Sequence, residues 1–296
     1  MSGLKLWFSA SRPRTLPAAI APVLVGTAAA VQHSGGDFRV LAFIAALLGS
    51  IFIQIGTNLA NDYSDARRGA DTMDRLGPLR VTSAGLVAPR RVLSATWLAF
   101  GCAVICGIYL IYVAGWVILA VGVASILAGV LYTGGPKPYG YAGLGEVFVF
   151  LFFGLVAVNG SYYVQLEELG WLAFGLSVSI GLLSTAILVV NNLRDIETDG
   201  RAGKNTLAVK LGRGRTRSLY VAMVLGAFAS LVVVLVLLGG PWWAMLALAA
   251  VPAAVRPVRT VLRSVDGPAL NGALADTGLL LGSFGLLCTV GLLLAA

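Results

Sequence analysis

Residues 40–65 read VLAFIAALLGSIFIQIGTNLANDYSD, a long apolar run that passes directly into an acidic, amide-rich motif. A helix needs about 20 mainly apolar residues to cross the hydrocarbon core of a bilayer. The run therefore predicts a transmembrane helix whose end carries the motif Asn61-Asp62-Tyr63-Ser64-Asp65 to one membrane surface. A second apolar run, 171–191, leads in the same way into a polar stretch that reads Asn191-Asn192-Leu193-Arg194-Asp195-Ile196-Glu197-Thr198-Asp199.

The composition of the whole chain agrees with these two stretches. Of its 296 residues, 58% are hydrophobic and only 11% are charged, whereas soluble domains carry about 25% charged residues. A chain with so few charges cannot cover a soluble surface. We therefore predict an all-α integral membrane protein that forms one transmembrane domain over residues 1–296, with the lipid bilayer as its partner.

Apolar runs separated by polar breaks predict nine transmembrane helices. Their approximate ranges are 15–32, 40–60, 92–112, 115–133, 144–162, 171–191, 219–238, 242–255 and 273–294. The two acidic motifs follow the second and the sixth helix. Internal repeats are common in membrane proteins, so this four-helix offset predicts two related four-helix halves plus a final helix.

The basic residues predict the orientation of the chain. With a cytoplasmic N-terminus, 20 of the 21 Lys and Arg residues fall in cytoplasmic segments, and Arg39 alone lies outside. This is the bias expected of an inserted membrane protein. It places the two long loops, about 61–91 and 192–218, in the cytoplasm and the protein in the cell membrane. The net charge of +8 is thus a signal of topology, and no nucleic-acid partner is predicted.

The acidic residues of the two loops have the spacing of a cation site. Asp62 and Asp65 are three residues apart and Asp195 and Asp199 are four apart, so each pair shares a face if the helix continues into the loop. Clustered carboxylates repel one another unless a cation neutralises them. Oxygen ligands without His or Cys suit Mg²⁺, which binds carboxylates together with substrate phosphates. The predicted ligand is a diphosphate held by Mg²⁺ and by the Arg and Lys side chains between the acids.

Ordinary solvated cytoplasmic loops are the alternative interpretation of these segments. They would explain the excess of Arg. They would not explain why seven of the 13 acidic residues gather here, namely Asp62, Asp65, Asp71, Asp74, Asp195, Glu197 and Asp199. For Asp74 and Glu197 both interpretations stay open.

The two motifs, placed after the second and sixth of nine helices, resemble those of the UbiA superfamily of intramembrane aromatic prenyltransferases. Stretches similar to its 1,4-dihydroxy-2-naphthoate polyprenyltransferase branch lie at 11–17, 61–71, 77–80, 138–146 and 192–207. One position departs from the broad pattern. Gly69 stands where many members have a third Asp, and the next carboxylate is Asp71, whose role as a metal ligand therefore stays open.

The resemblance implies transfer of a polyprenyl chain from its diphosphate to 1,4-dihydroxy-2-naphthoate. Diphosphate and CO₂ would leave, and demethylmenaquinol would form for menaquinone synthesis. Two Mg²⁺ ions would bridge the diphosphate, with Asp62, Asp65, Asp195 and Asp199 as metal ligands and, with Glu146, as the catalytic set. The residues expected to bind the substrates are Asn58, Asn61, Arg67, Asp71, Arg80, Tyr139, Asn192, Lys204, Arg12 and Arg14.

Glu146 and the aromatic rings near the proposed site add expectations about the reaction. Glu146 is an ionisable group at the edge of a span, which favours a functional role as base or acceptor, although a helix N-terminus also stabilises a carboxylate without any catalysis. Aromatic faces stabilise cations, and the candidate rings are Tyr63, Tyr139, Tyr141, Phe148, Phe152 and Phe153. For the three Phe residues, simple packing is the alternative.

Two other functions are alternatives to this one. Within the same class, the acceptor could be 4-hydroxybenzoate or homogentisate. From a different class, the chain could be a secondary transporter. Transporters place binding charges near the middle of the bilayer, whereas the charges here lie in loops at one surface.

Overall fold

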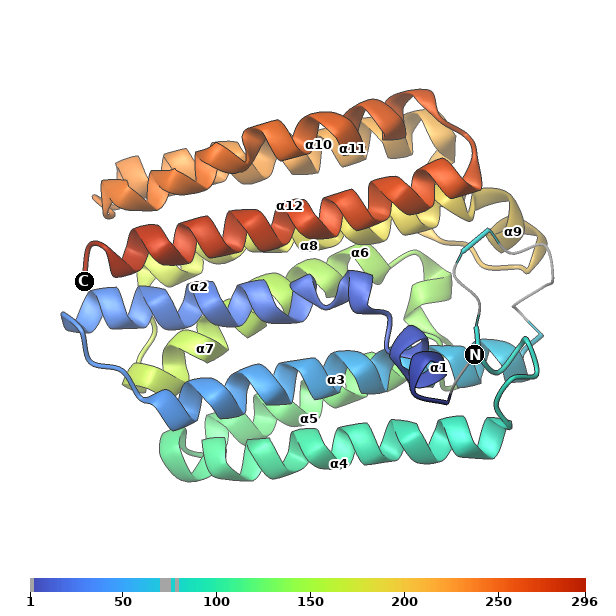
Figure 1. The fold of residues 1–296 in the computed structure, drawn as a ribbon, viewed down its shortest axis with the longest axis horizontal. Helices are drawn as coiled ribbons and strands as arrows, with labels where there is room; N and C mark the ends of the chain where they lie inside the picture. Colours follow the sequence, from blue (N-terminus) through green and yellow to red (C-terminus); the bar gives the residue numbers. More distant parts are fainter. Residues whose placement is uncertain (1–2, 70–75, 78–79) are drawn as a thin grey trace.

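The computed structural model describes residues 3–69, 76–77 and 80–296, and all regular secondary structure within them is helical. The long helices lie side by side along one axis of the molecule, as Figure 1 shows. The α-helices are α1 (Gly3–Ala10), α2 (Pro17–Ser34), α3 (Val40–Arg67), α4 (Pro89–Ala114), α5 (Trp116–Leu131), α6 (Gly145–Val149), α7 (Ala157–Leu166), α8 (Trp171–Arg194), α9 (Ile196–Arg201), α10 (Leu207–Leu237), α11 (Val251–Arg263) and α12 (Gly267–Leu293). This confirms the predicted all-α membrane fold.

The helices are long and apolar enough for a protein that crosses the membrane several times. In the described part of the chain, seven helical stretches meet this requirement: 40–67, 89–114, 145–166, 171–194, 207–237, 242–263 and 267–293. The N-terminal pair Lys5–Thr15 and Pro17–Ser34, bent by 55°, would make an eighth, and Trp116–Leu131 is apolar but shorter. Each predicted segment thus coincides with helical structure, while the count of nine membrane spans stays a prediction.

The two polar loops are shorter than predicted because the helices before them continue. α3 runs to Arg67 rather than to residue 60, and α8 runs to Arg194. α10 already begins at Leu207, where the Thr206 side chain accepts from the amide of Val209 and caps the helix. A hydropathy pattern predicts that a helix ends where its apolar residues end. Here polar residues continue each helix because the bundle supplies partners for them.

Small residues allow the helices to approach closely in the core. A Cβ atom on Gly285 of α12 would stand 2.7 Å from the Cβ of Ala21 on α2. Likewise, a Cβ on Gly154 would stand 2.6 Å from the Cα of Gly181 on α8. Close backbone approach at Gly and Ala is the usual basis of helix association in membranes. These contacts bring α12 against α2 and the Phe150–Val156 turn against α8.

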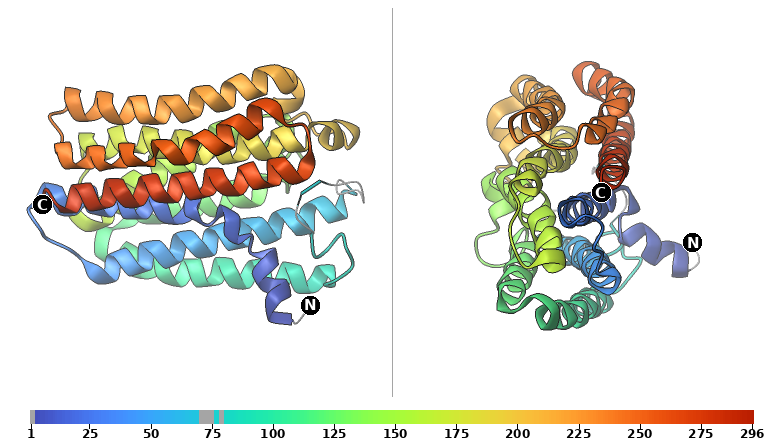
Figure 2. Two further views of the ribbon diagram at one scale, coloured as in Figure 1. Left: turned by 45° about the horizontal axis from the view of Figure 1, so that its top comes forward. Right: turned by 90° about the vertical axis from the view of Figure 1, so that its left-hand side faces the viewer.

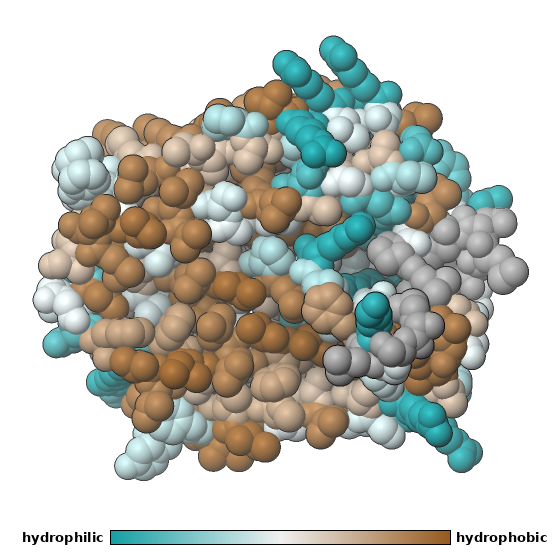
Figure 3. Space-filling model, viewed as in Figure 1, coloured by the Kyte–Doolittle hydropathy of each residue, from teal (hydrophilic) through white to brown (hydrophobic). Residues whose placement is uncertain are grey.

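Polar residues gather at the two ends of the bundle, and most of the hydrophilic surface lies at the end where α9 is found (Figure 3). The opposite end carries the pairs His33–Glu168 and Arg39–Glu167. Between the ends, the face shown in Figure 3 is mainly apolar. Figure 2 shows α1 projecting from the side of the bundle. The ends of α3 and α8, which carry the acidic motifs, lie at the same end of the molecule.

Candidate active site

A cavity of about 260 Å³ opens at the hydrophilic end of the bundle. Both acidic motifs contribute to its wall, together with the segments that connect the helices. The predicted site residues that line it are Arg12, Asn58, Asn61, Asp65, Arg80, Tyr139, Asn192, Asp195, Asp199 and Lys204. The structure thus brings most of the predicted residues to one place, although they come from positions almost 200 residues apart.

One face of α3 supplies the first wall of the cavity. Its amide and carboxylate residues are Gln54, Asn58, Asn61 and Asp65, which follow one another at intervals of four, three and four residues and so share a helix face. Asn61 is buried, and its side-chain oxygen accepts a hydrogen bond of 2.9 Å from the Thr133 hydroxyl. α3 therefore presents a polar stripe to the cavity from within a mainly apolar helix.

The N-terminal part of this stripe positions the segment before α2. The side-chain amides of Gln54 and Asn58 donate to the Thr15 hydroxyl oxygen at 3.1 and 3.3 Å. Next to this contact, Arg12 lines the cavity with a left-handed backbone at φ 55°, a conformation that is uncommon for residues other than Gly. Arg14 is exposed and does not line the cavity. The structure thus brings only the first of the two predicted arginines to the site.

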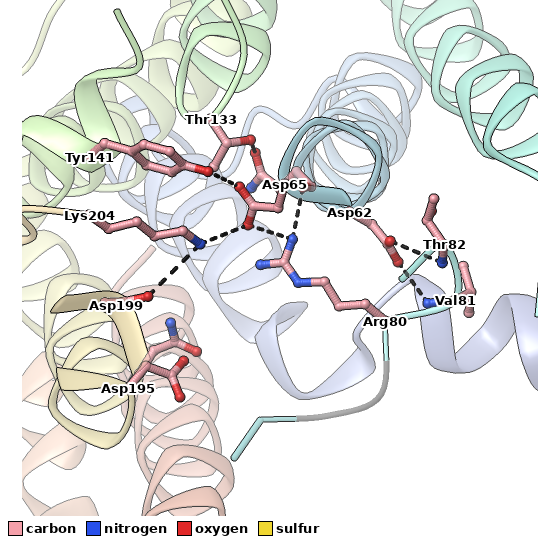
Figure 4. Close-up of polar contacts among 12 residues, drawn as sticks. Asp62, Asp65, Arg80, Val81, Thr82, Thr133, Tyr141, Asp195, Asp199 and Lys204 are labelled. Atoms are coloured by element: carbon pink, nitrogen blue, oxygen red, sulfur yellow. Dashed lines mark hydrogen bonds and ion pairs between the residues drawn. The ribbon is translucent and has the colours of Figure 1, made fainter. Parts of the chain in front are cut away.

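Asp65 is the centre of the polar contacts in the cavity (Figure 4). Its carboxylate is 1% exposed, and its Oδ2 lies 2.7 Å from Arg80 Nη1 and 3.2 Å from Lys204 Nζ. Its Oδ1 accepts a hydrogen bond from the Tyr141 hydroxyl. Lys204 Nζ also lies 3.9 Å from Oδ1 of Asp199. A buried charge is tolerated when it is paired and hydrogen-bonded, and here the partners of Asp65 connect the two acidic motifs.

Tyr141 reaches Asp65 from the connection between α5 and α6. Burial, and then the neighbouring Asp65 carboxylate, raise the pKa of the Tyr141 phenol, so it stays protonated and donates to Asp65. Lys204 Nζ lies 5.0 Å from the centroid of the same ring, within the range of a cation–π contact. Gly203, at φ 73°, makes the turn that directs Lys204 into the cavity. The ring thus positions both members of the Asp65–Lys204 pair.

Asp62, the other predicted metal ligand of the first motif, does not line the cavity. Its side chain points away from Asp65, as Figure 4 shows, and its carboxylate accepts hydrogen bonds from the backbone amides of Val81 at 3.0 Å and Thr82 at 3.2 Å. The residue is 4% exposed. Asp62 and Asp65 are three residues apart on α3, and this rotation about the helix axis lets the Asp62 side chain meet a different neighbour. Asp62 therefore holds the segment that begins with Arg80.

The second motif forms the opposite wall around a buried arginine. Arg194 is 0% exposed, and its Nε and Nη2 donate to the two carboxylate oxygens of Asp195 at 2.8 and 2.5 Å. Its other contacts are Nη1 to Asn271 of α12 at 2.7 Å and Nη2 to Asn191 at 3.0 Å. The arrangement orients the Asp195 carboxylate at the cavity wall and joins α8 to α12.

Glu146 also lies outside the cavity wall. Its Oε1 accepts a hydrogen bond of 2.9 Å from the side-chain amide of Asn192, which does line the cavity. Its Oε2 is buried and has no hydrogen-bond partner in the described part of the chain. Glu146 does not line the cavity itself. Its hydrogen bond orients the side chain of Asn192, which does.

A stack of aromatic rings lines the apolar side of the cavity. The ring centroids of Tyr139 and Phe148 are 3.9 Å apart, and those of Phe148 and Phe152 are 6.1 Å apart, with both pairs stacked. Phe152 lies in the π-helical turn Phe150–Val156, an irregularity that is frequent at functional sites. All three rings, and Phe153, line the cavity. These four rings and Tyr141 therefore lie in the cavity wall, and their role in stabilising a cation stays a prediction.

Arg67 and Tyr63 lie away from the cavity. Arg67 is exposed, and its Nη1 donates to the Tyr63 hydroxyl at 3.3 Å. Neither residue lines the cavity, so the structure does not bring the predicted substrate-binding Arg67 to the site. Glu197 pairs with Arg213 instead, and the hydrogen bond from Arg213 lowers the pKa of the Glu197 carboxyl. Asp71 and Asp74 lie outside the described residues.

Several residues that complete the site were not predicted from the sequence. The sequence prediction treats Arg194 only as a basic residue that indicates topology. Its position next to Asp195 could have indicated that the two side chains form an ion pair. Gln54 continues the four-residue spacing of Asn58 within an apolar helix, and this pattern is visible in the sequence. Thr133 and Asn271 give no such signal, because only the packing of α3 and α12 brings their side chains to the motifs.

The donor set of the cavity fits a magnesium diphosphate. Among the described residues, no three His, Cys, Asp or Glu side chains already converge as a metal site. Instead, Asn61 and Asp65 offer oxygens from one wall and Asp195 and Asp199 from the other, with cationic Arg80 and Lys204 in the same cavity. Hard cations such as Mg²⁺ prefer one or two carboxylates and complete their coordination with phosphate oxygens and water. An anionic ligand between the walls would supply the remaining oxygens.

Comparisons with known proteins agree with this geometry. A model of the UbiA prenyltransferase family matches residues 19–280. The chain is 44% identical to the 1,4-dihydroxy-2-naphthoate octaprenyltransferase of Mycobacterium tuberculosis over 280 residues, which cover 94% of each chain. It is 38% identical to the protein of the same name from Escherichia coli, with 94% of this chain and 91% of that one covered.

A solved structure shows the same fold. It is described as a UbiA homolog from Archaeoglobus fulgidus bound to GPP and Mg²⁺, and it matches with a TM-score of 0.65 over 96% of this chain and 99% of that chain. The sequences are only 13% identical, so this likeness concerns the arrangement of the helices.

Proposed function

The chain belongs to the UbiA prenyltransferase family, and from this premise we propose that it transfers a polyprenyl chain from its diphosphate to 1,4-dihydroxy-2-naphthoate. Diphosphate and CO₂ leave, and demethylmenaquinol is formed for menaquinone synthesis. The names of the relatives support this acceptor. It is a multi-pass membrane enzyme, as its apolar helices and its family indicate.

One observation carries the proposal: the same cavity has a charged part and an apolar, aromatic part. At the hydrophilic end, Arg80 and Lys204 meet around the buried carboxylate of Asp65. Elsewhere, the wall includes the stacked rings of Tyr139 and Phe148 and many aliphatic side chains. A ligand with a diphosphate head and a hydrocarbon tail matches both parts.

Magnesium fits the head end of the cavity. We assign Asn61, Asp65, Asp195 and Asp199 as the residues that would hold Mg²⁺ with the diphosphate, two ions in all, with one pair of residues on each wall. When bound, the metal neutralises the negative charge that develops on the departing diphosphate. The solved structure of the same fold, described as bound to GPP and Mg²⁺, supports the use of magnesium with a prenyl diphosphate.

The protein's own side chains account for the main steps of prenyl transfer. Arg80 and Lys204 donate to the diphosphate oxygens, and they favour breaking of the allylic C–O bond because the electron pair leaves with the diphosphate. The faces of Tyr139, Phe148 and Phe152 shield the allylic cation from water and stabilise it. The acceptor ring then forms a carbon–carbon bond to this cation, and the carboxylate of the acceptor leaves as CO₂.

Arg12 and Asn192 are positioned to bind the acceptor. Arg12 lines the cavity next to the N-terminus of α2, where its guanidinium can pair with a carboxylate. Asn192 lines the cavity and donates its side-chain N–H to Glu146, and its amide oxygen can accept a hydrogen bond from a phenol. The acceptor would thus lie between α2 and α8, against the aromatic wall.

The proposal is tested by direct detection of the product. Membranes that contain the protein are incubated with 1,4-dihydroxy-2-naphthoate, a polyprenyl diphosphate and Mg²⁺, and the lipid extract is examined by mass spectrometry. We expect demethylmenaquinol, with no product when the metal is chelated. Prenylation of 4-hydroxybenzoate or homogentisate in place of the naphthoate would overturn the acceptor assignment.

We propose that the active-site end faces the cytoplasm of the cell membrane. The basis is the charge bias of the sequence, which puts 20 of the 21 Lys and Arg residues on the side of the acidic motifs and Arg39 on the other. A single cysteine introduced at exposed Arg201 of α9, in a variant whose three native cysteines are replaced, should react with a membrane-impermeant maleimide only in inverted vesicles. Labelling in intact cells would reverse the orientation.

Charge removal should separate the diphosphate-binding cations from those that only determine topology. Arg80→Ala or Lys204→Ala should lower kcat/KM for the prenyl donor at least tenfold, which is about 1.4 kcal/mol of transition-state stabilisation. Arg215→Ala is the matched control, because Arg215 is exposed and outside the cavity, and it should change activity little. Donor kinetics at equal protein abundance decide the point. Equal losses in all three variants would contradict the division.

A further inference from the structure

A serine in the middle of α8 has a buried hydroxyl that nothing in the described part of the chain satisfies. Ser184 is 2% exposed and lines the cavity, yet its Oγ has no hydrogen-bond partner there. Leu183, just before it, and Ile187, one turn after it, belong to the main hydrophobic cluster. Buried polar groups are nearly always hydrogen-bonded, because an unpaired one destabilises the fold. The Ser184 hydroxyl therefore points to a polar group of a ligand in this part of the cavity.

Other hydroxyls of the same helix have their partners within the protein. Thr185 Oγ1 donates to the carbonyl of Gly181 at 2.7 Å. The hydroxyl of Ser177 donates to the carbonyl of Phe174. This bond to a carbonyl of the preceding turn is the usual one for a serine or threonine inside a helix. Ser184 differs from these residues because it lines the cavity and makes no such bond.

Ser184 lies on the face of α8 that forms the cavity wall. The α8 residues in this wall recur at helical spacing, and they are Ser184, Ile187, Leu188, Asn191 and Asn192. From Ser184 to Asn192 the helix rises about 12 Å, and from Ser184 to Asp195 about 16 Å, at 1.5 Å per residue. Ser184 is therefore far along the helix from the carboxylates that would hold the diphosphate.

Two hydroxyls on opposite sides of one aromatic ring fit the distance between Ser184 and Asn192. With a hydrogen bond of about 2.8 Å at either end, such a ring joins two groups that are about 11 Å apart. The side-chain N–H of Asn192 is engaged by Glu146, so its amide oxygen is the group that can meet the first hydroxyl. Ser184 can turn about χ1 between staggered positions, and its hydroxyl can both donate and accept. It can therefore pair with the second hydroxyl.

We propose that Ser184 is a specificity residue for the acceptor. It binds the ring hydroxyl opposite the one held by Asn192, and it thereby selects a 1,4-dihydroxy aromatic acid over an acid with one hydroxyl. The inference rests on the proposed function, because the acceptor must lie against α8 to reach both residues. A water molecule is the other occupant that would satisfy Ser184, but a water would give no preference between the two acids.

Removing the hydroxyl of Ser184 should abolish this preference. The probes are 1,4-dihydroxy-2-naphthoate and 1-hydroxy-2-naphthoate, which differ only in the hydroxyl assigned to Ser184. Their Kd values are measured by titration calorimetry with Mg²⁺ and inorganic diphosphate present. The native protein should bind the dihydroxy acid about five- to tenfold more tightly, as expected for one hydrogen bond. Ser184→Ala should raise the Kd of the dihydroxy acid by the same factor and change that of the monohydroxy acid less than twofold.

Ser177→Ala is the matched control for this substitution. Ser177 lies on the same helix, is 0% exposed and does not line the cavity, so this variant should keep the native preference. Steady-state kinetics give a second measurement. Ser184→Ala should raise KM for the dihydroxy acid and leave KM for the prenyl diphosphate unchanged, because Ser184 lies far from the residues that would hold the diphosphate.

Two results would overturn the proposal. One is equal affinity of the native protein for the two acids, or a preference that persists in Ser184→Ala, as expected if Ser184 binds water. The other is an equal loss of affinity for both acids in Ser184→Ala, which would indicate a general disturbance of the cavity. If the native protein bound the acids with the expected preference but prenylated neither, the proposed function would fail, while the role of Ser184 in binding would stand.

Discussion

Replacing Asp65 with Asn should lower kcat for prenyl transfer by a factor on the order of 100 to 1,000, or about 2.7–4 kcal/mol. The substitution keeps the shape of the side chain but removes the carboxylate that pairs with both Arg80 and Lys204. It also removes one proposed Mg²⁺ ligand. The loss should appear mainly in kcat, because these charges matter most when the diphosphate departs.

The dependence of activity on Mg²⁺ distinguishes a ligand from a positioning residue. Asp65→Asn should require more Mg²⁺ for half-maximal activity. Asp62→Asn should keep the native requirement and raise KM for the donor, because Asp62 holds only the backbone of Val81 and Thr82 next to Arg80. Asp37→Asn, an exposed residue at the opposite end of the bundle, is the control for charge loss alone. A shift in the Mg²⁺ requirement of Asp62→Asn equal to that of Asp65→Asn would restore Asp62 as a ligand.

Replacing Asp195 with Leu should destabilise the fold by about 3–5 kcal/mol, because it leaves a buried guanidinium without its counter-charge. Arg194 is fully buried, and Asp195 accepts from two of its nitrogens. The remaining partners, Asn191 and Asn271, are neutral. Thermal unfolding of the purified protein in one detergent measures the loss.

The double variant Arg194→Met/Asp195→Leu separates folding from function. Replacing a buried ion pair with apolar residues of similar size is often neutral or stabilising, so the double variant should recover most of the stability lost in Asp195→Leu. It should nevertheless be inactive, since Asp195 is a proposed Mg²⁺ ligand. An unfolding midpoint of Asp195→Leu equal to that of the native protein would show that the pair contributes nothing to the fold.

Much of the fold follows from the sequence alone. Low charge content and long apolar runs require a membrane protein, because only helices and closed barrels satisfy the backbone within lipid. The acidic motifs lie at the ends of two such helices, so the order of residues along the chain is enough to indicate their chemistry, oxygen ligands interleaved with Arg and Lys. Helix ends were less predictable. α3 and α8 extend past their apolar runs because buried partners accept the polar residues that follow.

The assignment of individual side chains to the cavity required the tertiary structure. Spacing places Asp62 and Asp65 near one another on α3, but it does not tell which neighbour each one meets. Packing of the segment around Val81 against α3 gives Asp62 backbone amides to bind, while Asp65 faces the cavity with Lys204. A sequence determines the period of a helix and the chemistry on its faces. Which face meets the cavity depends on contacts between residues far apart in the chain, and these exist only once the helices have packed.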